Sequence, residues 1–343
     1  MDRKDFLSWL GIGSAIFGGN YFLNKKDINN QISLCSSTDD INTISAPVSL
    51  SVEGRPGYNL KPNPYGGMVH APLYIKEDYG GRFYFSPEYK SDYIENINTV
   101  ITAYSLNLGI AHSISTEAWT FNGTTPGPIL RYREGTNLRI KFQNKTNEVH
   151  SLHFHGNHDP KEDGWDGIPS YGEYEYCITC DPPGIHPYHC HVPPIAKHIA
   201  KGLYGAMIVD PVIPRKKAHE FVLIFSGWDL KNRGINDIYS WNGIAGYYER
   251  FPIKVPIGQL VRLYIINLSE YDPIMTFHLH GKIFDVYRSG STKVPDFQSD
   301  VVSLGPTERA ILEFTLEKKG RYMFHPHQSR MAERGAMGWI VGV

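Results

Sequence analysis

Residues 184–198 read Gly-Ile-His-Pro-Tyr-His-Cys-His-Val-Pro-Pro-Ile-Ala-Lys-His, and at their centre stands the triplet His189-Cys190-His191. In an extended strand successive side chains point to opposite faces, so the two histidines share one face and the cysteine points to the other. Cys190 must therefore serve a site separate from the one that its neighbours serve. The stretch predicts two sites that are joined through a single residue.

The same pattern has an altered second copy, because residues 320–327 read Gly-Arg-Tyr-Met-Phe-His-Pro-His. Upstream, residues 119–123 resemble 239–243, residues 135–144 resemble 258–267, and residues 153–156 resemble 278–281. The offsets between matched points are 120, 123 and 125 residues, so the two stretches align with only small insertions. This near-constant spacing indicates an internal repeat of two similar domains.

The repeat is built from short strand-like runs. Residues 138–142 and 261–265 alternate apolar and polar side chains, which is typical of half-buried strands. The 343-residue chain also holds 33 glycines and 23 prolines, which suit many turns better than long helices. We therefore expect an all-β protein with two tandem β-sandwiches, at residues 97–212 and 216–343.

The composition excludes two broad classes of protein. The chain has 34 Lys and Arg against 35 Asp and Glu, so it lacks the basic excess of a general nucleic-acid binder. Aromatic residues make up 13% of the chain and charged residues 20%, which excludes a largely disordered protein.

The first 96 residues precede the repeat. Residues 1–27 have a basic start, an apolar middle and a polar end, which predicts a signal peptide or a membrane anchor. A buried helix of the first domain is the alternative. Residues 28–96 form a polar linker and then a Tyr-, Pro- and Gly-rich extension. We expect export to the periplasm or another extracytoplasmic space, with a membrane tether if the segment stays uncleaved.

Ten of the fifteen histidines fall into four clusters, one in each matching part of the repeat. The clusters are His150-x-x-His153-x-His155, His189-Cys190-His191 with His198, His278-x-His280 and His325-x-His327. Each His-x-His pair directs two imidazoles to one point, and four pairs supply eight. Imidazole suits copper, zinc, iron and nickel, but two histidines with one thiolate in a trigonal array are typical of blue copper.

On these motifs the chain resembles the multicopper oxidases, specifically their two-domain, laccase-like members, over residues 97–343. The resemblance implies two cupredoxin-like Greek-key sandwiches and about four copper ions per chain. The implied type 1 ligands are His150, Cys190 and His198, with Leu203 at the axial position. The implied type 2 ligands are His153 and His278, and the type 3 ligands are His155, His189, His191, His280, His325 and His327.

The resemblance also implies an activity and an assembly. A donor would pass single electrons to the type 1 copper, and Cys190 would carry them to a trinuclear cluster that reduces dioxygen to water. The donor would be a phenol, an aromatic amine, a metal ion or a small redox protein. Asp166 resembles the family's proton relay, although a plain turn aspartate fits equally. Three subunits would form a homotrimer with trinuclear sites between subunits.

The second domain lacks a type 1 site, because its aligned positions hold Met275, Pro326, Met331 and Ala336. Two other functions stay open. A copper-containing nitrite reductase shares the fold, but in its pattern an aspartate replaces the histidine at 153 and no histidine follows the cysteine. A non-catalytic copper-binding or electron-transfer protein would not need eight further imidazoles.

The remaining cysteines and histidines have weaker signals. Cys177 and Cys180 are expected as buried free thiols, because residues three apart in a strand point to opposite faces; a metal-binding or redox pair is the alternative. His158 and His186 lie near the clusters and are expected to support them or to carry protons. The sequence predicts structural roles for His70, His112 and His219.

Replacing Leu203 by Met should lower the reduction potential of the type 1 copper. A thioether donates electron density to the copper and leucine does not, so the native residue favours a high potential. Redox titration of the blue band in both proteins measures the difference. An unchanged or higher potential in the variant would refute the axial assignment of position 203.

Overall fold

Strand β4 (Asn137–Asn144) alternates buried and accessible side chains along its whole length, as its sequence predicts. It pairs in parallel with β1 (Asn96–Ala111) and antiparallel with β6 (Glu173–Thr179). With β2 (Ile114–Phe121) at the edge, these strands form a sheet in the order β2-β1-β4-β6. The computed structural model describes residues 96–111, 114–290 and 293–343, so the predictions for residues 1–27 and for nearly all of 28–96 lie outside the described residues.

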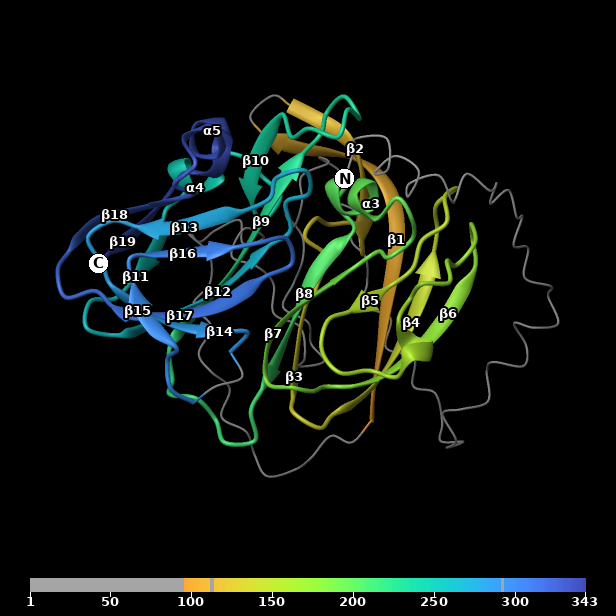
Figure 1. Cartoon of the computed structure of the whole chain (residues 1–343), viewed down its shortest axis with the longest axis horizontal. Coiled ribbons are helices and arrows are strands. Elements are labelled where there is room, and N and C mark those ends of the chain that lie inside the picture. Colours follow the sequence, from red (N-terminus) through yellow and green to blue (C-terminus); the bar gives the residue numbers. More distant parts are fainter. Residues whose placement is uncertain (1–95, 112–113, 291–292) are drawn as a thin grey trace, which may run out of the picture. The chain divides into compact units, whose positions relative to one another are not determined.

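A second sheet packs on this one and closes the first sandwich (Figure 1). It has the order β3-β8-β7-β5. Its strands are β3 (Ile129–Arg133), β8 (Tyr204–Asp210), β7 (Gly184–His189) and β5 (His153–Phe154). Buried side chains of both sheets, such as Phe142 from the first and Tyr188 from the second, belong to one apolar cluster.

The second sandwich repeats this plan with longer sheets. One sheet has the order β10-β9-β12-β17-β14-β15, and the other has the order β11-β19-β18-β13-β16. The strands of the first are β9 (His219–Trp228), β10 (Ile238–Trp241), β12 (Leu260–Asn267), β14 (Phe284–Arg288), β15 (Phe297–Ser299) and β17 (Arg309–Thr315). The strands of the second are β11 (Ile253–Val255), β13 (Met275–Leu279), β16 (Val301–Leu304), β18 (Gly320–His325) and β19 (Gly338–Gly342).

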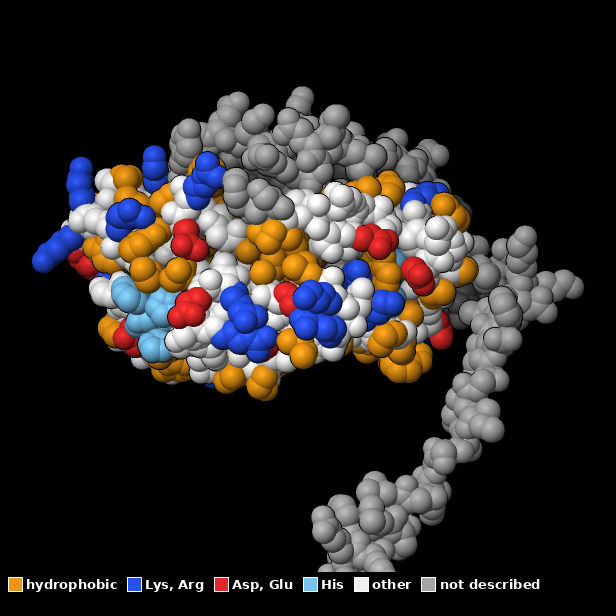
Figure 2. All heavy atoms as spheres, turned by 90° about the horizontal axis from the view of Figure 1, so that it is seen from above, with side chains coloured by type: hydrophobic (Ala, Val, Ile, Leu, Met, Phe, Trp, Pro, Cys, Tyr) orange, Lys and Arg blue, Asp and Glu red, His pale blue; other side chains and the backbone are white. Residues whose placement is uncertain are grey.

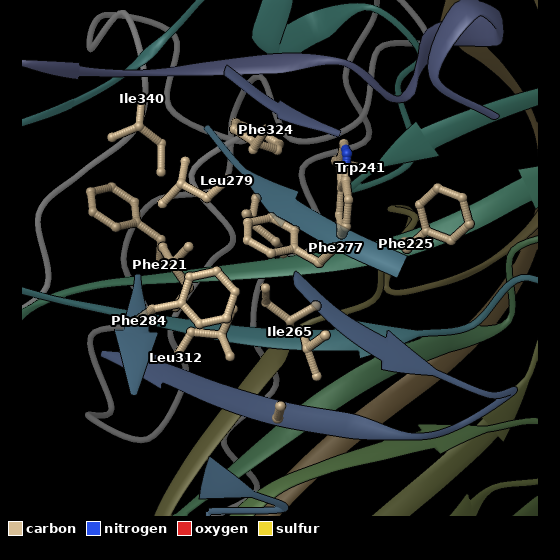
Figure 3. Close-up of a cluster of buried hydrophobic side chains, with 14 of the residues drawn as sticks. Phe221, Phe225, Trp241, Ile265, Phe277, Leu279, Phe284, Leu312, Phe324 and Ile340 are labelled. Carbon is tan, nitrogen blue, oxygen red and sulfur yellow. The ribbon is translucent and has the colours of Figure 1, made fainter. Parts of the chain in front are cut away.

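Aromatic side chains fill the space between these two sheets (Figure 3). Trp241 lies edge-on to Phe277, with ring centroids 5.8 Å apart, and its Nε1–H donates to the Ala336 carbonyl. Burial of such rings is the main contribution to the stability of a sandwich. The prediction of an all-β protein with two similar sandwiches is confirmed.

Strand pairing follows the sequence repeat. The parallel pair β1–β4 corresponds to the parallel pair β9–β12, and β3–β8 corresponds to β11–β19. The helices are short: η2 (Pro160–Glu162), α3 (Ile195–Ala200), α4 (Tyr247–Arg250), α5 (Ser329–Met331) and η3 (Ala332–Ala336). None of the helices in the described part of the chain has the length and apolar character needed to cross a bilayer.

Strand β12 differs from the prediction. Residues 261–265 were expected to be half-buried, yet all of them are buried, including Arg262. The reason is that this sheet packs against the first sandwich: Tyr264 and Ile266 join Ile185 and Ile208 in a third apolar cluster. Both faces of β12 are therefore covered.

Arg262 is accommodated there by a buried network of charges that links the two sandwiches. Glu220 of β9 accepts from Arg131 of the first sandwich and from Arg262 of the second, each at 2.6 Å. Asp210 and Glu313 pair with the other edges of the two guanidinium groups, at 2.7 and 2.6 Å. A buried charge stays ionised at such a position only when it is paired and hydrogen-bonded.

Replacing Glu220 by Ala should lower the free energy of unfolding by about 3–5 kcal/mol, because it leaves two buried guanidinium groups without their shared partner. The matched control is Glu317→Ala, which removes the same side chain from an exposed pair with Lys282. Chemical denaturation of both variants measures the change. Equal unfolding midpoints for the two variants would show that the network adds no stability.

Candidate metal centres

A buried cluster of one thiol and two imidazoles lies in the first sandwich. His150 Nδ1 and His198 Nδ1 are 3.1 Å apart, and Cys190 Sγ lies 3.2 Å from His198 Nδ1 and 3.8 Å from His150 Nδ1. The three atoms thus form a triangle of the size that one small metal ion would span. The structure brings these three donor atoms together, and their role as ligands of one metal stays a prediction.

Local structure determines where each of these side chains points. His150 lies in an isolated bridge with Ile168, Cys190 directly follows β7, and His198 is in α3. Leu203 connects the last two through its backbone: its carbonyl accepts from the Cys190 N–H and its N–H donates to the His198 carbonyl. The Leu203 side chain is fully buried in the apolar core of the sandwich.

Burial makes the protein groups of this site electrically neutral. It lowers the pKa of His150 to about 3, with the nearby His198 adding to the effect, and lowers the pKa of His198 to about 4. Burial also raises the pKa of the Cys190 thiol to about 11. Unprotonated imidazoles are ready to donate to a metal, whereas the thiol must lose its proton when a metal binds.

A second cluster forms where β5 pairs with β7. His153 lies opposite His189 in the strand register, and His155 Nε2 is 3.0 Å from His189 Nε2. His191 stacks on His153 with ring centroids 4.5 Å apart. Burial lowers the pKa of His155 to about 2 and that of His189 to about 4. Four imidazoles therefore gather at this end of the first sandwich, and burial keeps His155 and His189 neutral.

A third cluster repeats the second one in the other sandwich. His278 of β13 lies opposite His325 of β18, and His280 Nε2 is 3.0 Å from His325 Nε2. His327 completes the set, with its ring centroid 5.3 Å from that of His278. The sequence repeat thus predicts a repeat in three dimensions, down to the same 3.0 Å separation between matched imidazoles.

The third cluster is the more accessible of the two. His280 and His327 are exposed and the other two members are half-buried; histidine side chains gather in one patch on the molecular surface in Figure 2. In the described part of the chain, each possible metal-binding group with several histidines takes all of them from one sandwich. The two clusters are therefore separate groups within this single chain.

A carboxylate that the sequence analysis overlooked lies against the second cluster. Asp163 Oδ1 is 3.4 Å from His153 Nδ1, and Asp163 Oδ2 is 3.7 Å from His191 Nδ1. The Asp163 carbonyl also accepts from His153 Nδ1 at 2.8 Å. Asp166, which the sequence analysis proposed for proton transfer, is exposed on the same loop. Its role stays a prediction.

Gly164 explains why Asp163 reaches the histidines. Its φ is +74°, and a Cβ there would lie 2.0 Å from the Leu152 carbonyl oxygen, so only glycine allows the loop to fold back on the strand. The Asp163-Gly164 pair was the available signal in the sequence. It could not be separated from Asp166-Gly167 without the path of the loop.

The other histidines near the clusters have distinct surroundings. His158 lies beside His153, with ring centroids 5.5 Å apart, and 4.0 Å from Asp163. His186 is buried and donates to the Pro182 carbonyl, and Arg309 of β17 reaches its other ring nitrogen at 3.5 Å. His219 is buried and bonds with Gln259. The last contact fits the structural role expected for His219.

The cysteine pair upstream of β7 differs in part from its prediction. Cys180 is free and buried in the core, as expected. Cys177 is disulfide-bonded, so the prediction of a free thiol is wrong at this position. The physical reason is the strand alternation: Cys180 points into the sandwich, whereas Cys177 is on the half-buried outer side of β6.

Tandem sandwiches with paired imidazoles and a buried thiol–imidazole triangle define a copper oxidoreductase of the cupredoxin type. The sequence profiles described as multicopper oxidase match residues 105–212 and 226–342. A solved structure described as a multicopper oxidase is 38% identical, with a TM-score of 0.71, over 72% of this chain and 89% of that one. The chain belongs to the multicopper oxidase family.

Relatives with two other descriptions are also similar. The copper-containing nitrite reductase of Neisseria meningitidis is 26% identical over 278 residues, covering 74% of this chain and 71% of its own. The solved nitrite reductase from Nitrosomonas europaea is 27% identical with a TM-score of 0.67, over 72% of this chain and 94% of that one. Laccase-13 of Arabidopsis thaliana is 27% identical over 58% of this chain and 40% of its own. The descriptions of the nitrite reductases and of the solved multicopper oxidase all name copper.

Replacing Asp163 by Asn should weaken copper retention at the second cluster about 10- to 100-fold, because a carboxylate that orients metal-binding imidazoles is lost while its shape is kept. Copper content after dialysis against graded chelator measures the effect. Asp166→Asn is the matched control and should retain copper like the unaltered protein. If Asp166→Asn lost copper more readily than Asp163→Asn, the supporting role would belong to Asp166.

Proposed function

We propose that this protein is a laccase-like oxidase, which takes single electrons from a donor at a type 1 copper and reduces dioxygen to water at a trinuclear copper cluster. Reduction of one dioxygen to two waters consumes four electrons and four protons. Four copper ions per chain, when bound, would supply the redox equivalents, one electron each. The protein groups hold the ions, connect the two kinds of site and deliver protons.

The observation that carries the proposal is the completeness of the imidazole pairs. The second and third clusters hold four histidines each, including His153 and His191. A nitrite reductase would need only a single type 2 copper with three histidines, and in that pattern an aspartate takes the place of His153. Eight imidazoles are the number that three copper ions of a trinuclear cluster require.

Each ligand has a proposed place. His150, Cys190 and His198 would bind the type 1 copper, with Leu203 in the axial direction, and His153 and His278 would bind the type 2 copper. The type 3 pair would be held by His155, His189, His191, His280, His325 and His327.

Cys190 would carry electrons between the two kinds of site. Its thiol belongs to the buried triangle, while its backbone neighbours His189 and His191 belong to the second cluster. The covalent path from sulfur to either imidazole therefore runs through one peptide unit. Asp163, which lies against two imidazoles of that cluster, would pass protons inward, and Asp166 is exposed to solvent.

We propose that the trinuclear cluster is completed between subunits of a homotrimer. The two half-sites are separate groups in the described chain, and the half-site on the second sandwich has exposed imidazoles. Exposed apolar side chains stand near both half-sites, among them Trp165 beside His191 and Val301 opposite His278. A head-to-tail contact that closes after three subunits would cover these surfaces.

The export of the protein stays a proposal as well. Residues 1–27, which would direct the chain to the periplasm or tether it to the membrane, lie outside the described residues. The activity needs no particular compartment, but a phenol, an aromatic amine, a metal ion or a small redox protein would be available as donor there.

A copper-containing nitrite reductase is the second candidate. The similarity to nitrite reductases over 74% of the chain favours it. A non-catalytic copper carrier is the third candidate. Such a carrier would need only one copper site, so it does not explain the eight further imidazoles.

Oxygen uptake separates these functions. With a phenolic donor we expect about four donor molecules oxidised per dioxygen consumed, about four coppers per chain and an intense blue band. Cys190→Ser should abolish the blue band and the uptake while copper stays bound at the other clusters. Copper content that saturates at two per chain, with turnover only when nitrite is added, would make the protein a reductase.

Mixed oligomers test the shared cluster. His155→Ala and His280→Ala should each be inactive alone, because each variant loses one half of every trinuclear site. Co-expressed with different tags and purified through both, the mixed rings should recover about a third of the unaltered activity, since every three-membered head-to-tail ring that holds both variants pairs two intact halves at one contact in three. Recovery near zero in purified mixed rings would place the whole cluster within one chain.

A further inference from the structure

We propose that Lys197, which lies over the Trp119 ring beside the type 1 ligands, makes this protein select aromatic electron donors that carry an anionic group. The inference deepens the proposed function, because it assumes that electrons enter at the type 1 site. It does not depend on whether dioxygen or nitrite receives them.

Trp119 forms one wall of the type 1 site. Its ring centroid is 4.9 Å from that of His150 and 4.9 Å from that of His198, so one indole packs on both imidazoles. Only 6% of the residue is exposed. The backbone N–H of Trp119 donates to the Lys201 carbonyl at 2.8 Å, which ties the end of β2 to the end of α3. The indole is thus held in a fixed place against the ligand pair.

Lys197 places a positive charge on the outer side of this wall. Its Nζ lies 5.3 Å from the Trp119 ring centroid, within the range of a cation–π contact, and the residue is exposed. It directly precedes His198 in α3, so the ammonium group stands next to the type 1 ligands in the chain as well as over the Trp119 ring.

The charge is available to a ligand from solution. Within the described residues, no carboxylate lies within ion-pair distance of Lys197. Two charged residues at the ends of the same elements have partners of their own: the Lys201 ammonium donates to the Glu117 carbonyl, and the Glu117 carboxylate accepts from Ser105. An anionic group can therefore approach Lys197 without displacing an existing partner.

Apolar groups lie next to this charge. Pro193 and Pro194 are exposed and Ile195 is half-buried, and they lead directly into α3. An aromatic ring can lie on such a surface while its carboxylate or sulfonate pairs with Lys197. A single ammonium suits one anionic group on a small molecule, whereas the acidic face of a redox protein is normally met by several cations.

The test uses two phenols that differ only in charge, one with a sulfonate and one with a quaternary ammonium group. Anaerobic stopped-flow bleaching of the blue band gives a reduction rate for each donor, independent of the final acceptor. At low ionic strength, Lys197→Glu should lower the ratio of the sulfonate rate to the ammonium rate about tenfold or more, and salt should shrink the difference. Lys201→Glu, the matched control with the same change of charge, should shift the ratio less than twofold.

A binding measurement supplements the rates. The redox-inert anion 2-naphthalenesulfonate, titrated calorimetrically into the copper-free protein, should bind about tenfold more weakly to Lys197→Glu than to the unaltered chain. Circular dichroism of the variant checks that it is folded.

Two outcomes would overturn the inference. If Lys197→Glu changed the rates of both phenols by the same factor, Lys197 would act through the reduction potential rather than through donor charge. If neither rate changed, Lys197 would not belong to the donor site. Oxygen uptake is scored separately. A protein that bleaches with the expected selectivity but consumes no oxygen would disprove the proposed oxidase and leave this inference intact.

Discussion

The register between paired strands is the constraint on which the candidate metal centres depend. His153 stands opposite His189 on β5 and β7, and His278 stands opposite His325 on β13 and β18. Because side chains alternate along a strand, a slip of one residue would turn all of these imidazoles toward the core. The apolar residues between them, which fill both sandwiches, prevent such a slip, so packing energy and metal geometry support the same register.

The Cys190 side chain points to the face of the strand opposite to that of its two neighbouring histidines, because side chains alternate along a strand. Its flanking histidines face the second cluster, and its thiol points into the sandwich where His150 and His198 meet it. The low-dielectric surroundings keep all three groups uncharged, so copper binding must expel the thiol proton. The apolar core thus provides both the stability of the first sandwich and the environment of its metal site.

The contact between the sandwiches contains buried charged groups, unlike the apolar interiors of the two sandwiches. It combines an apolar cluster with the buried pairs that Glu220 makes to Arg131 and Arg262. Charged pairs of this kind tolerate little displacement, because each group must keep its hydrogen bonds in a medium that cannot replace them. The two domains of one chain are therefore joined firmly, which suits a protein whose proposed cluster is assembled from halves of different subunits.

The sequence by itself determined the all-β class, the tandem repeat and the ten clustered histidines. Strand periodicity and the similar spacing of repeated motifs can both be read directly from the order of residues. It also determined that Cys190 faces away from its neighbours. Only the tertiary structure decided that Asp163, rather than Asp166, lies against the imidazoles, that both faces of β12 are buried, and that Cys177 is not a free thiol. These features depend on how a loop folds back and on which sheet covers which, and such long-range contacts leave no periodic signal in the residues that make them.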